Sequence, residues 1–304
     1  MSPVEILLTI LDFLRMVVMF NYHLLYATFR LFVPVEPKSL KGEIVLITGA
    51  GGGIGRQLAL QYAKQGCKVV CLDIDEKNNE KTVKEANSVV QKSAVGYKCD
   101  ITSREEVLAI AERVKKEVGC VTVLVNNAGI MPTRSLLQHT HEVVRKVMDI
   151  NLMSHFWALE AFLPAMYEAK RGTIVSTSSL LGLMGMPNTV PYTASKFAVR
   201  GYMEALLSEI LDLHPDADIQ MLTVCPSWVD TNLVHTVKMR FPNLFRALSP
   251  KYVAEQVVLA HRRGQREITV PWFYSGIIHF LRLMPYKCNE VVRRFLDGKV
   301  ECDL

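Results

Sequence analysis

The stretch "IVLITGAGGGIG" (Ile44–Gly55) joins a short run of apolar and β-branched residues to a glycine-rich turn. A continuous run of this length is typical of a strand that is buried on both faces of a parallel sheet. The following residues, "RQLALQYAKQG" (Arg56–Gly66), have the apolar spacing of a helix, and Gly66 is suited to end it. The stretch therefore predicts a strand, a turn and a helix in succession.

The same alternation of strands and helices continues to about residue 270. Because strands joined by helices of this length form right-handed βαβ units, we expect helices on both faces of a parallel sheet. The predicted fold class is α/β, a Rossmann-like doubly wound parallel sheet of about seven strands with an N-terminal apolar helix. The predicted strands are 44–48, 68–73, 94–100, 121–127, 172–179, 219–226 and 266–270, and the predicted helices are 56–66, one from about 76, 104–119, 141–168 and 191–214.

Composition excludes several classes of protein. The net charge is only +5 over 304 residues, and basic residues are mixed with acidic ones, so no nucleic-acid partner is expected. The seven cysteines lack zinc-type spacing and the eight histidines form no metal-ligand spacing, so no metal is expected. Reduced thiols in a compartment like the cytosol are the simplest reading of the odd cysteine count.

The glycine-rich turn lies where backbone amides and a helix N-terminus can hold the pyrophosphate of a dinucleotide. Gly49 permits the turn, Gly53 lets a phosphate approach the backbone, and Gly55 allows close packing of the helix. We expect these three glycines and Ile54 to bind the cofactor.

Asp73 ends the second predicted strand, eighteen residues after Gly55. A carboxylate at this place can bind both ribose hydroxyls of NAD and would repel the 2′-phosphate of NADP. The alternative is that Asp73 only caps the next helix. The spacing favours NAD as the cofactor.

Candidate catalytic side chains converge on the carboxyl ends of the strands. In "PYTASKF", Tyr192 and Lys196 lie four residues apart on one helix face, where the ammonium should lower the pKa of the phenol. Ser179 ends the preceding strand, and "NNAG" (Asn126–Gly129) ends the fourth strand at the same edge. Asn151 lies in the long predicted helix among residues that look half-buried.

Together with "TGAGGGIG", Asp73 and Cys99–Asp100, these residues resemble the short-chain dehydrogenase/reductase superfamily from about Lys41 to Val270. The resemblance implies a tetrad in which Tyr192 is the general base, Ser179 holds the reacting oxygen and Lys196 assists Tyr192 and binds the ribose. The fourth member, Asn151, would position a proton-relay water. It also implies that the cofactor is bound by Asp100, Ile101, Asn126, Ala128 and Thr231. One departure is Ser227, where the family usually has glycine, and which fits only if its φ is negative.

More narrowly, "GEIVLITGAGGGIGR", "NLMSHFWALEAFLPAM" and "YTASKFAVRGY" resemble the membrane-associated retinol and 17-beta-hydroxysteroid dehydrogenases. This implies NAD-dependent oxidation of a lipophilic alcohol, such as a retinol or hydroxysteroid, to the aldehyde or ketone. It also implies a homodimer and a place on the cytosolic face of the endoplasmic reticulum membrane or on a lipid droplet. Two alternatives stay open: an NAD-binding scaffold with little turnover, and a carbonyl reductase of the same fold.

The loops that follow the fifth and sixth strands are apolar and contain methionine and aromatic residues, which suit a flexible hydrophobic substrate or ordinary loop packing. These residues are Met184, Met186, Trp228, Phe241 and Phe245. The expected organisation is a membrane-anchoring segment (1–33), a linker (34–42), the NAD-binding domain (43–271) and a C-terminal extension (272–304) that contacts a membrane or covers the substrate.

The predicted anchoring segment (1–33) contains charged residues among its apolar ones. On a helix, Glu5, Asp12, Arg15, His23 and Arg30 fall within roughly 80° of one another, which suits a helix lying in the membrane interface. A tilted span with Asp12 and Arg15 paired is the second reading, and a helix docked on protein is the third.

Overall fold

The computed structural model describes residues 2–231, 233, 237–242 and 246–302, with only the backbone described for Leu31. Phe245 therefore lies outside the described residues. The chain divides into two units, Met1–Lys38 and Ser39–Leu304.

The first unit contains one helix, α1 (Pro3–Phe32), followed by a short non-helical segment to Lys38. Its N-terminus is fixed by a capping box, in which the Ser2 hydroxyl accepts from the Glu5 amide at 3.2 Å and the Glu5 carboxylate accepts from the Ser2 amide at 2.7 Å. No helix in the described part of the chain is both long enough and apolar enough to cross a membrane.

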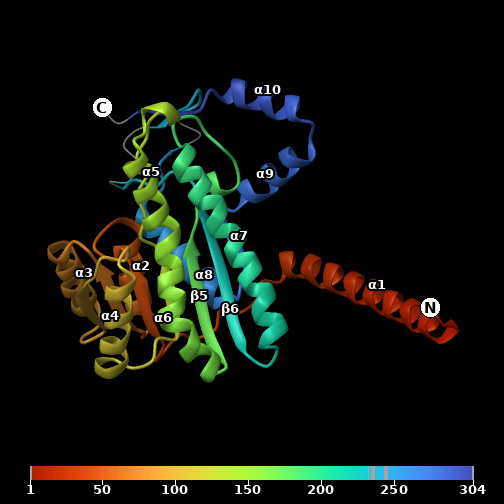
Figure 1. Ribbon diagram of the computed structural model, residues 1–304, viewed down its shortest axis with the longest axis horizontal. Coiled ribbons are helices and arrows are strands. Elements are labelled where there is room, and N and C mark those ends of the chain that lie inside the picture. The colour runs from red at the N-terminus through yellow and green to blue at the C-terminus, as the bar shows by residue number, and fades with distance from the viewer. Residues whose placement is uncertain (1, 232, 234–236, 243–245, 303–304) are drawn as a thin grey trace. The chain divides into compact units, whose positions relative to one another are not determined.

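The second unit is built on a seven-stranded parallel sheet with the strand order β3-β2-β1-β4-β5-β6-β8 (Figure 1). The order reverses between β1 and β4, and ligands bind at such a switch point in open α/β sheets. The strands are β1 (Ile44–Thr48), β2 (Lys68–Asp73), β3 (Ala94–Lys98), β4 (Val123–Asn126), β5 (Arg171–Thr177), β6 (Asp218–Pro226) and β8 (Glu267–Val270).

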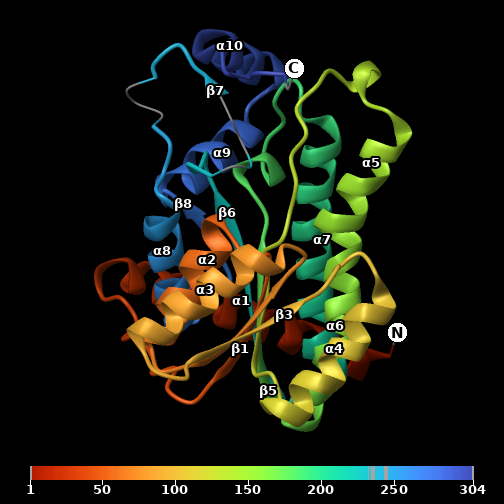
Figure 2. The ribbon, with the colours of Figure 1, turned by 90° about the vertical axis from the view of Figure 1, so that its left-hand side faces the viewer.

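Helices cover both faces of the sheet because side chains of the buried strands alternate between them (Figure 2). Val45 and Ile47 of β1 pack with α2 and α8, whereas Leu46 packs with α4, α6 and α7. The helices of these two layers are α2 (Gly53–Lys64), α3 (Glu76–Val89) and α8 (Pro250–Arg262) on one face, and α4 (Arg104–Glu117), α6 (Ser154–Glu168) and α7 (Val190–Leu213) on the other.

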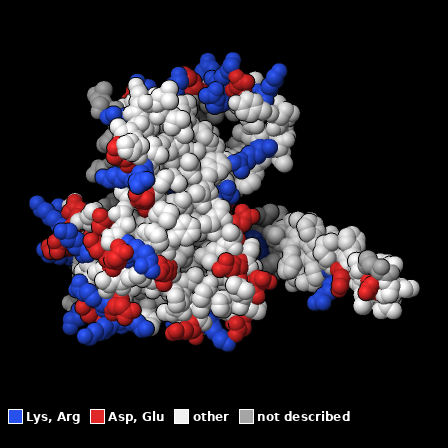
Figure 3. All heavy atoms as spheres, in the orientation of Figure 1, with Lys and Arg blue, Asp and Glu red and all other residues white. Residues whose placement is uncertain are grey.

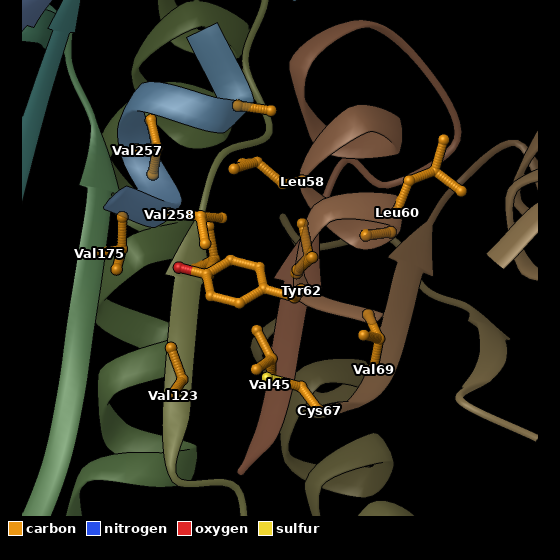
Figure 4. Packing of buried hydrophobic residues seen from close by; sticks show 14 of the residues in the cluster. Val45, Leu58, Leu60, Tyr62, Cys67, Val69, Val123, Val175, Val257 and Val258 are labelled. Carbon is orange, nitrogen blue, oxygen red and sulfur yellow. The ribbon is translucent and has the colours of Figure 1, made fainter. Parts of the chain in front are cut away.

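Tyr62 of α2 fills the first of these layers (Figure 4). It is fully buried among Val45, Val123 and Val258, and its hydroxyl lies 3.2 Å from Nδ1 of His261 on α8. Burial raises the pKa of this phenol well above its usual value. A large aromatic side chain thus joins α2, which follows the glycine-rich turn, to the helix that precedes β8.

The predicted helix 141–168 is interrupted in the structure. It begins as α5 (His141–Met148), continues through a π-helical turn (Asp149–Met153) and ends as α6. The extra residue of a π-turn has no place in a regular 3.6-residue repeat, so the apolar pattern did not predict it. The turn contains Asn151.

The chain after β6 was predicted only in part. Helix α8, a two-stranded antiparallel ladder and two exposed helices are further elements of this region. The ladder joins β7 (Val237–Lys238) to β9 (Lys299–Val300), and the helices are α9 (Phe273–Leu283) and α10 (Tyr286–Leu296). The short 3-10 turns are Leu136–Gln138 and Leu180–Gly182.

Candidate active site

The glycine-rich turn between β1 and α2 is packed too tightly for side chains. A Cβ atom on Gly55 would lie 2.1 Å from the carbonyl oxygen of Gly49, and one on Gly49 would lie 2.8 Å from Cα of Ala128. Gly49 and Gly53 also have positive φ angles of 68° and 51°. The N-cap of α2 is Gly52, which has no side chain to cap the helix, so the first amides of α2 are available to an anion.

Asp73 is fixed beside this turn at the end of β2. Its carboxylate accepts hydrogen bonds from the Gly51 amide at 2.7 Å and the Asp75 amide at 2.9 Å. It therefore places a negative charge at the rim of the glycine turn, as a pair of ribose hydroxyls requires and a 2′-phosphate does not tolerate. The next helix is capped by Asp75 rather than by Asp73, so the capping alternative for Asp73 does not hold.

One continuous cavity of about 940 Å³ runs from this turn past Ser179 and Tyr192 to residues of the C-terminal extension. Gly49, Gly53, Ile54 and Asp73 line its first part, together with Asp100 and Ile101 beyond the end of β3. The Asp100 carboxylate accepts from the amide of Thr102 at 2.9 Å and from its hydroxyl at 2.7 Å. The tight turn, the fixed carboxylate and the groove beyond them fit the pyrophosphate, ribose and adenine of a dinucleotide.

The two asparagines of the "NNAG" stretch have different places. Asn126 is 1% exposed and does not line the cavity; its side chain contacts the Tyr202 hydroxyl. Asn127 lines the cavity, and its side chain donates to the carbonyl of Thr48 at 3.1 Å. Ala128 lines the cavity as expected. Asn126 therefore lies behind the predicted cofactor site. Asn127 was not predicted to line it, because two adjacent asparagines cannot be told apart by residue type alone.

Tyr192 and Lys196 meet at the cavity wall from the first turns of α7. Tyr192 is 5% exposed and Lys196 is 3% exposed, and the Lys196 Nζ donates to the Thr177 carbonyl at 2.8 Å. Burial raises the pKa of Tyr192 to about 12, against an opposing hydrogen bond with the Ser179 hydroxyl, and burial lowers the pKa of Lys196 to about 8. The expected lowering of the Tyr192 pKa is thus not found in the protein without cofactor, because desolvation of the phenolate outweighs the other effects.

Ser179 lies opposite Tyr192 at the end of β5. It caps a 3-10 turn, and its Oγ accepts from the Leu181 amide at 3.1 Å. It lines the cavity, so one hydroxyl contacts the phenol of Tyr192 and faces the space where a substrate oxygen would sit. The neighbouring Ser178 has a structural place instead: its hydroxyl donates to the Lys196 carbonyl at 2.8 Å.

Asn151 is held in the π-helical turn. Its side chain makes a reciprocal pair with the backbone of Ile130, donating to the carbonyl at 2.9 Å and accepting from the amide at 2.8 Å. It also donates to the Ser195 hydroxyl at 3.1 Å. Asn151 is fully buried and does not itself line the cavity. A Cβ on Gly129 would lie 3.3 Å from its Oδ1 and 3.6 Å from the Lys196 Nζ, so both groups border the same glycine.

The loop after β6 packs against the glycine-rich turn. A Cβ on Gly53 would lie 3.1 Å from Cγ2 of Thr231, and Thr231 lines the cavity. Ser227 does not have a positive φ, so serine is accommodated where the family usually has glycine. Its hydroxyl instead forms a hydrogen bond with the Tyr274 hydroxyl on α9.

The part of the cavity beyond Tyr192 is apolar and rich in methionine. Met184, Met186 and Trp228 line it as expected, whereas Phe241 does not. The lining also includes residues that were not named individually from the sequence: Met131, Val237, Met239, Tyr274, Leu296 and Val300. Val237 and Met239 belong to the loop after β6, which was expected to border the substrate. The last three belong to the C-terminal extension, which was expected to contact a membrane or cover the substrate.

Arg56 is another lining residue that was not predicted. It lies one residue after Gly55, and its guanidinium is paired with Glu85 of α3 at 2.6 Å. A basic residue in this part of the cavity could attract a 2′-phosphate, but here a carboxylate neutralises it. The pairing agrees with the expectation, based on Asp73, that the cofactor is NAD rather than NADP.

Comparison with known proteins identifies relatives along almost the whole chain. A family model described as "short chain dehydrogenase" matches residues 43–240. Short-chain dehydrogenase/reductase family 16C member 6 of Bos taurus is 37% identical over 86% of this chain and 83% of its own length. Epidermal retinol dehydrogenase 2 of Homo sapiens is 36% identical over 90% and 89%, and 17-beta-hydroxysteroid dehydrogenase 13 of Homo sapiens is 34% identical over 96% of each chain.

The fold has a close counterpart among solved structures. A short-chain dehydrogenase/reductase from Burkholderia phymatum, solved in complex with NAD, superposes with a TM-score of 0.71. The match covers 88% of this chain and 99% of that one at 24% sequence identity. This likeness supports the Rossmann-like architecture.

Proposed function

The chain belongs to the short-chain dehydrogenase family, and from this premise we propose that it uses NAD to oxidise a lipophilic alcohol of the retinol or hydroxysteroid class. The observation that carries the proposal is the course of the cavity. One continuous space passes the glycine turn and Asp73, then Ser179 and Tyr192, and ends among apolar side chains. A dinucleotide at one end and an apolar alcohol at the other would meet at the tyrosine.

The reacting groups have complementary tasks. Ser179 donates its hydroxyl hydrogen to the substrate oxygen and holds it beside the phenol. Tyr192 accepts the proton of the substrate hydroxyl as general base. Lys196 and Asn151 both border Gly129. Lys196 would assist Tyr192 and bind the ribose, and Asn151 would position the water through which the proton moves on. Bound NAD supplies the acceptor for the hydride that leaves the carbinol carbon, so the alcohol becomes an aldehyde or ketone.

The proposal assigns each part of NAD to residues around the cavity. The amides of the glycine turn would hold the pyrophosphate and Asp73 the adenosine ribose, while Asp100 and Ile101, which line the same cavity, would border the adenine. Thr231, which lies against Gly53, would bind the nicotinamide. Asn126 supports this site from behind rather than by contact.

We place the enzyme on the cytosolic side of the endoplasmic reticulum membrane or on a lipid droplet, where its substrate is dissolved. α1 carries exposed apolar side chains along its length and would lie in the interface with its charges toward the headgroups. In the second unit, Trp272, Phe280 and Leu283 are 82%, 61% and 80% exposed, and basic side chains gather over α10 (Figure 3). Residues 272–304 therefore offer both apolar and cationic groups to a lipid surface.

A homodimer is part of the proposal. The middle of the face over α7 carries few charged side chains, whereas charges gather over α3 and α4 (Figure 3). Leu211 and Leu213, at the C-terminal end of α7, are 56% and 64% exposed and would add apolar area to an interface between two copies.

The test is turnover of the purified full chain in detergent micelles with NAD against retinol, hydroxysteroids and long-chain primary alcohols. Formation of NADH with at least one lipophilic alcohol, absent in Tyr192→Phe, is the expected result. NAD binding without hydride transfer to any of them would favour the scaffold function. Faster reduction of the carbonyl compounds with NADH at physiological cofactor ratios would favour the reductase.

A further inference from the structure

The C-terminal tail of the chain forms part of the cavity wall beside Tyr192. Its strand β9 pairs antiparallel with β7 of the loop after β6, with Val300 opposite Val237 and Lys299 opposite Lys238. Successive residues of a strand face opposite sides. Accordingly, Val300 is 3% exposed and lines the cavity, while Lys299 is exposed to solvent.

Two side chains outside the ladder hold the tail in this place. Asn188 donates from Nδ2 to the Val300 carbonyl at 2.9 Å, and the buried Thr133 donates to the Glu301 carbonyl at 2.6 Å. Asn188 has a φ of 65°, a conformation that asparagine tolerates better than most residues, and lies just before the start of α7. The tail is therefore tied to the segments that precede α7 and that follow β4, the same segments that frame the tyrosine.

The Val300 side chain packs directly in the catalytic neighbourhood. It forms one buried cluster with Met131, Leu181 and Tyr192. A Cβ on Gly298 would lie 2.7 Å from Sδ of Met239, so the tail is also seated closely on the loop after β6. Tyr192 belongs to the same cluster and both residues line the cavity, so Val300 borders the part of the cavity in which the tyrosine would act.

We propose that Val300 selects the substrate by limiting the bulk at its carbinol carbon, which favours a primary alcohol on a slim apolar chain over a secondary ring alcohol. The inference rests on the proposed alcohol oxidation and names the substrate class more closely. A β-branched side chain is stiff at χ1, so it makes a firm wall, in contrast to the methionines elsewhere in the cavity, which can adapt to the rest of the ligand.

The experiment compares kcat/KM for a long-chain primary alcohol and a hydroxysteroid in the full chain and in Val300→Ala. We expect Val300→Ala to shift the ratio of the two values toward the ring alcohol by about tenfold, since one or two methyl groups in an apolar pocket have effects of this size. Val300→Phe should shift the ratio the other way. Lys299→Ala is the matched control, because it removes a side chain from the same ladder on the solvent side and should leave the ratio unchanged.

A second variant and a second measurement distinguish the role of Val300 from the proposed alcohol oxidation on which it rests. Thr133→Val removes one tail contact without changing a lining side chain, and should shift the ratio in the direction of Val300→Ala by a smaller factor. Binding of both alcohols to NAD-saturated protein is measured by calorimetry, so selectivity is read even if turnover is absent. Absent turnover would refute the proposed function, whereas unchanged selectivity in a folded Val300→Ala, by both binding and kinetics, would overturn the role of Val300.

Discussion

The Nζ atom of Lys196 lies 5.6 Å from the centre of the Tyr192 ring, and both side chains are almost completely buried. Burial shifts both groups toward their neutral forms: it raises the pKa of Tyr192 to about 12 and lowers that of Lys196 to about 8. At neutral pH the phenol is therefore protonated and uncharged, while most of the lysine still carries its charge. A tyrosine in this state is a poor base. The positive nicotinamide of bound NAD would favour the phenolate, which couples base strength to cofactor binding.

Replacing Tyr192 by phenylalanine should remove catalysis and leave the cofactor site intact. We expect kcat to fall by a factor of about 10² to 10⁴, the usual contribution of a positioned general base, with an unchanged Kd for NAD. Steady-state kinetics and NAD titration measure the two quantities. Tyr274→Phe is the control, since Tyr274 lines the same cavity but bonds to Ser227. Near-normal turnover in Tyr192→Phe would show that another group takes the proton.

The buried Lys196 should reduce stability below pH 8. The pKa of Lys196 is about 8 in the folded protein and near 10.5 in the unfolded chain. Between pH 8 and pH 10.5 the unfolded chain therefore binds more protons at this lysine than the folded protein does. The contribution of Lys196 to the free energy of unfolding consequently rises with pH in this range. Below pH 8 the shift corresponds to about 3 kcal/mol, of which the hydrogen bond to Thr177 offsets about 1 kcal/mol.

Lys196→Met should therefore raise the free energy of unfolding by about 2 kcal/mol at pH 7 and by close to zero at pH 9.5, while abolishing turnover. Urea denaturation at the two pH values measures the difference. A surface control such as Lys299→Met should show no pH-dependent gain. Equal or lower stability of Lys196→Met at pH 7 would mean that the burial of this ammonium is compensated by contacts other than Thr177.

The fold could be predicted from the local sequence patterns of the strands. The family and the doubly wound sheet are confirmed, and the strand limits of β1 and β2 agree to the residue, because continuous β-branched runs bounded by glycine or charge have few other readings. The interruption at Asn151 was not predictable in this way, since a π-turn changes the backbone by one residue without changing the apolar pattern.

The residues of the site also differ in how well local sequence predicts them. Residues beside a strand end or a glycine turn, such as Asp73 and Ser179, line the cavity as predicted, because the edge of a parallel sheet fixes their position. Val300 was not named individually, although the C-terminal extension was expected to contact a membrane or cover the substrate. Its place in the cavity depends on long-range pairing with β7, and no local signal encodes that partner. Asn126 was assigned to the cofactor although its side chain turns toward Tyr202.

Asp73 should determine the choice of cofactor. Replacing Asp73 by serine removes the negative charge that would repel a 2′-phosphate, and it also removes one hydrogen-bond acceptor for the ribose. The ratio of kcat/KM for NAD to kcat/KM for NADP should therefore fall by about 10- to 100-fold, the size expected for loss of a charged hydrogen bond. Asp75→Asn is the control: Asp75 caps α3 and does not line the cavity, and asparagine is an equally good cap. A ratio that stays unchanged in Asp73→Ser would assign cofactor choice to another group, with Arg56 and its partner Glu85 the next to vary.

The orientation of α1 in a lipid surface can be tested by placing charge on either face of the helix. Ile10 and Val17 lie in the middle of the apolar stripe, whereas Leu8 and Met19 lie within the stripe of charged residues. If the helix lies in the interface, Ile10→Glu with Val17→Glu should lower vesicle binding by at least about 100-fold, since two buried aliphatic side chains contribute roughly 2 kcal/mol each. Leu8→Glu with Met19→Glu should have little effect, because those carboxylates would enter the headgroup layer.

Flotation of the purified chain with phosphatidylcholine vesicles measures all three proteins under the same conditions. The comparison separates the three readings of the helix, because each makes a different prediction for the matched pair. A helix that spans the bilayer would lose binding equally in both double variants, since charge at Met19 is as costly in hydrocarbon as charge at Val17. A helix that docks on protein would leave flotation unchanged in both. Only a helix lying in the interface predicts a large loss for the first pair and retained binding for the second.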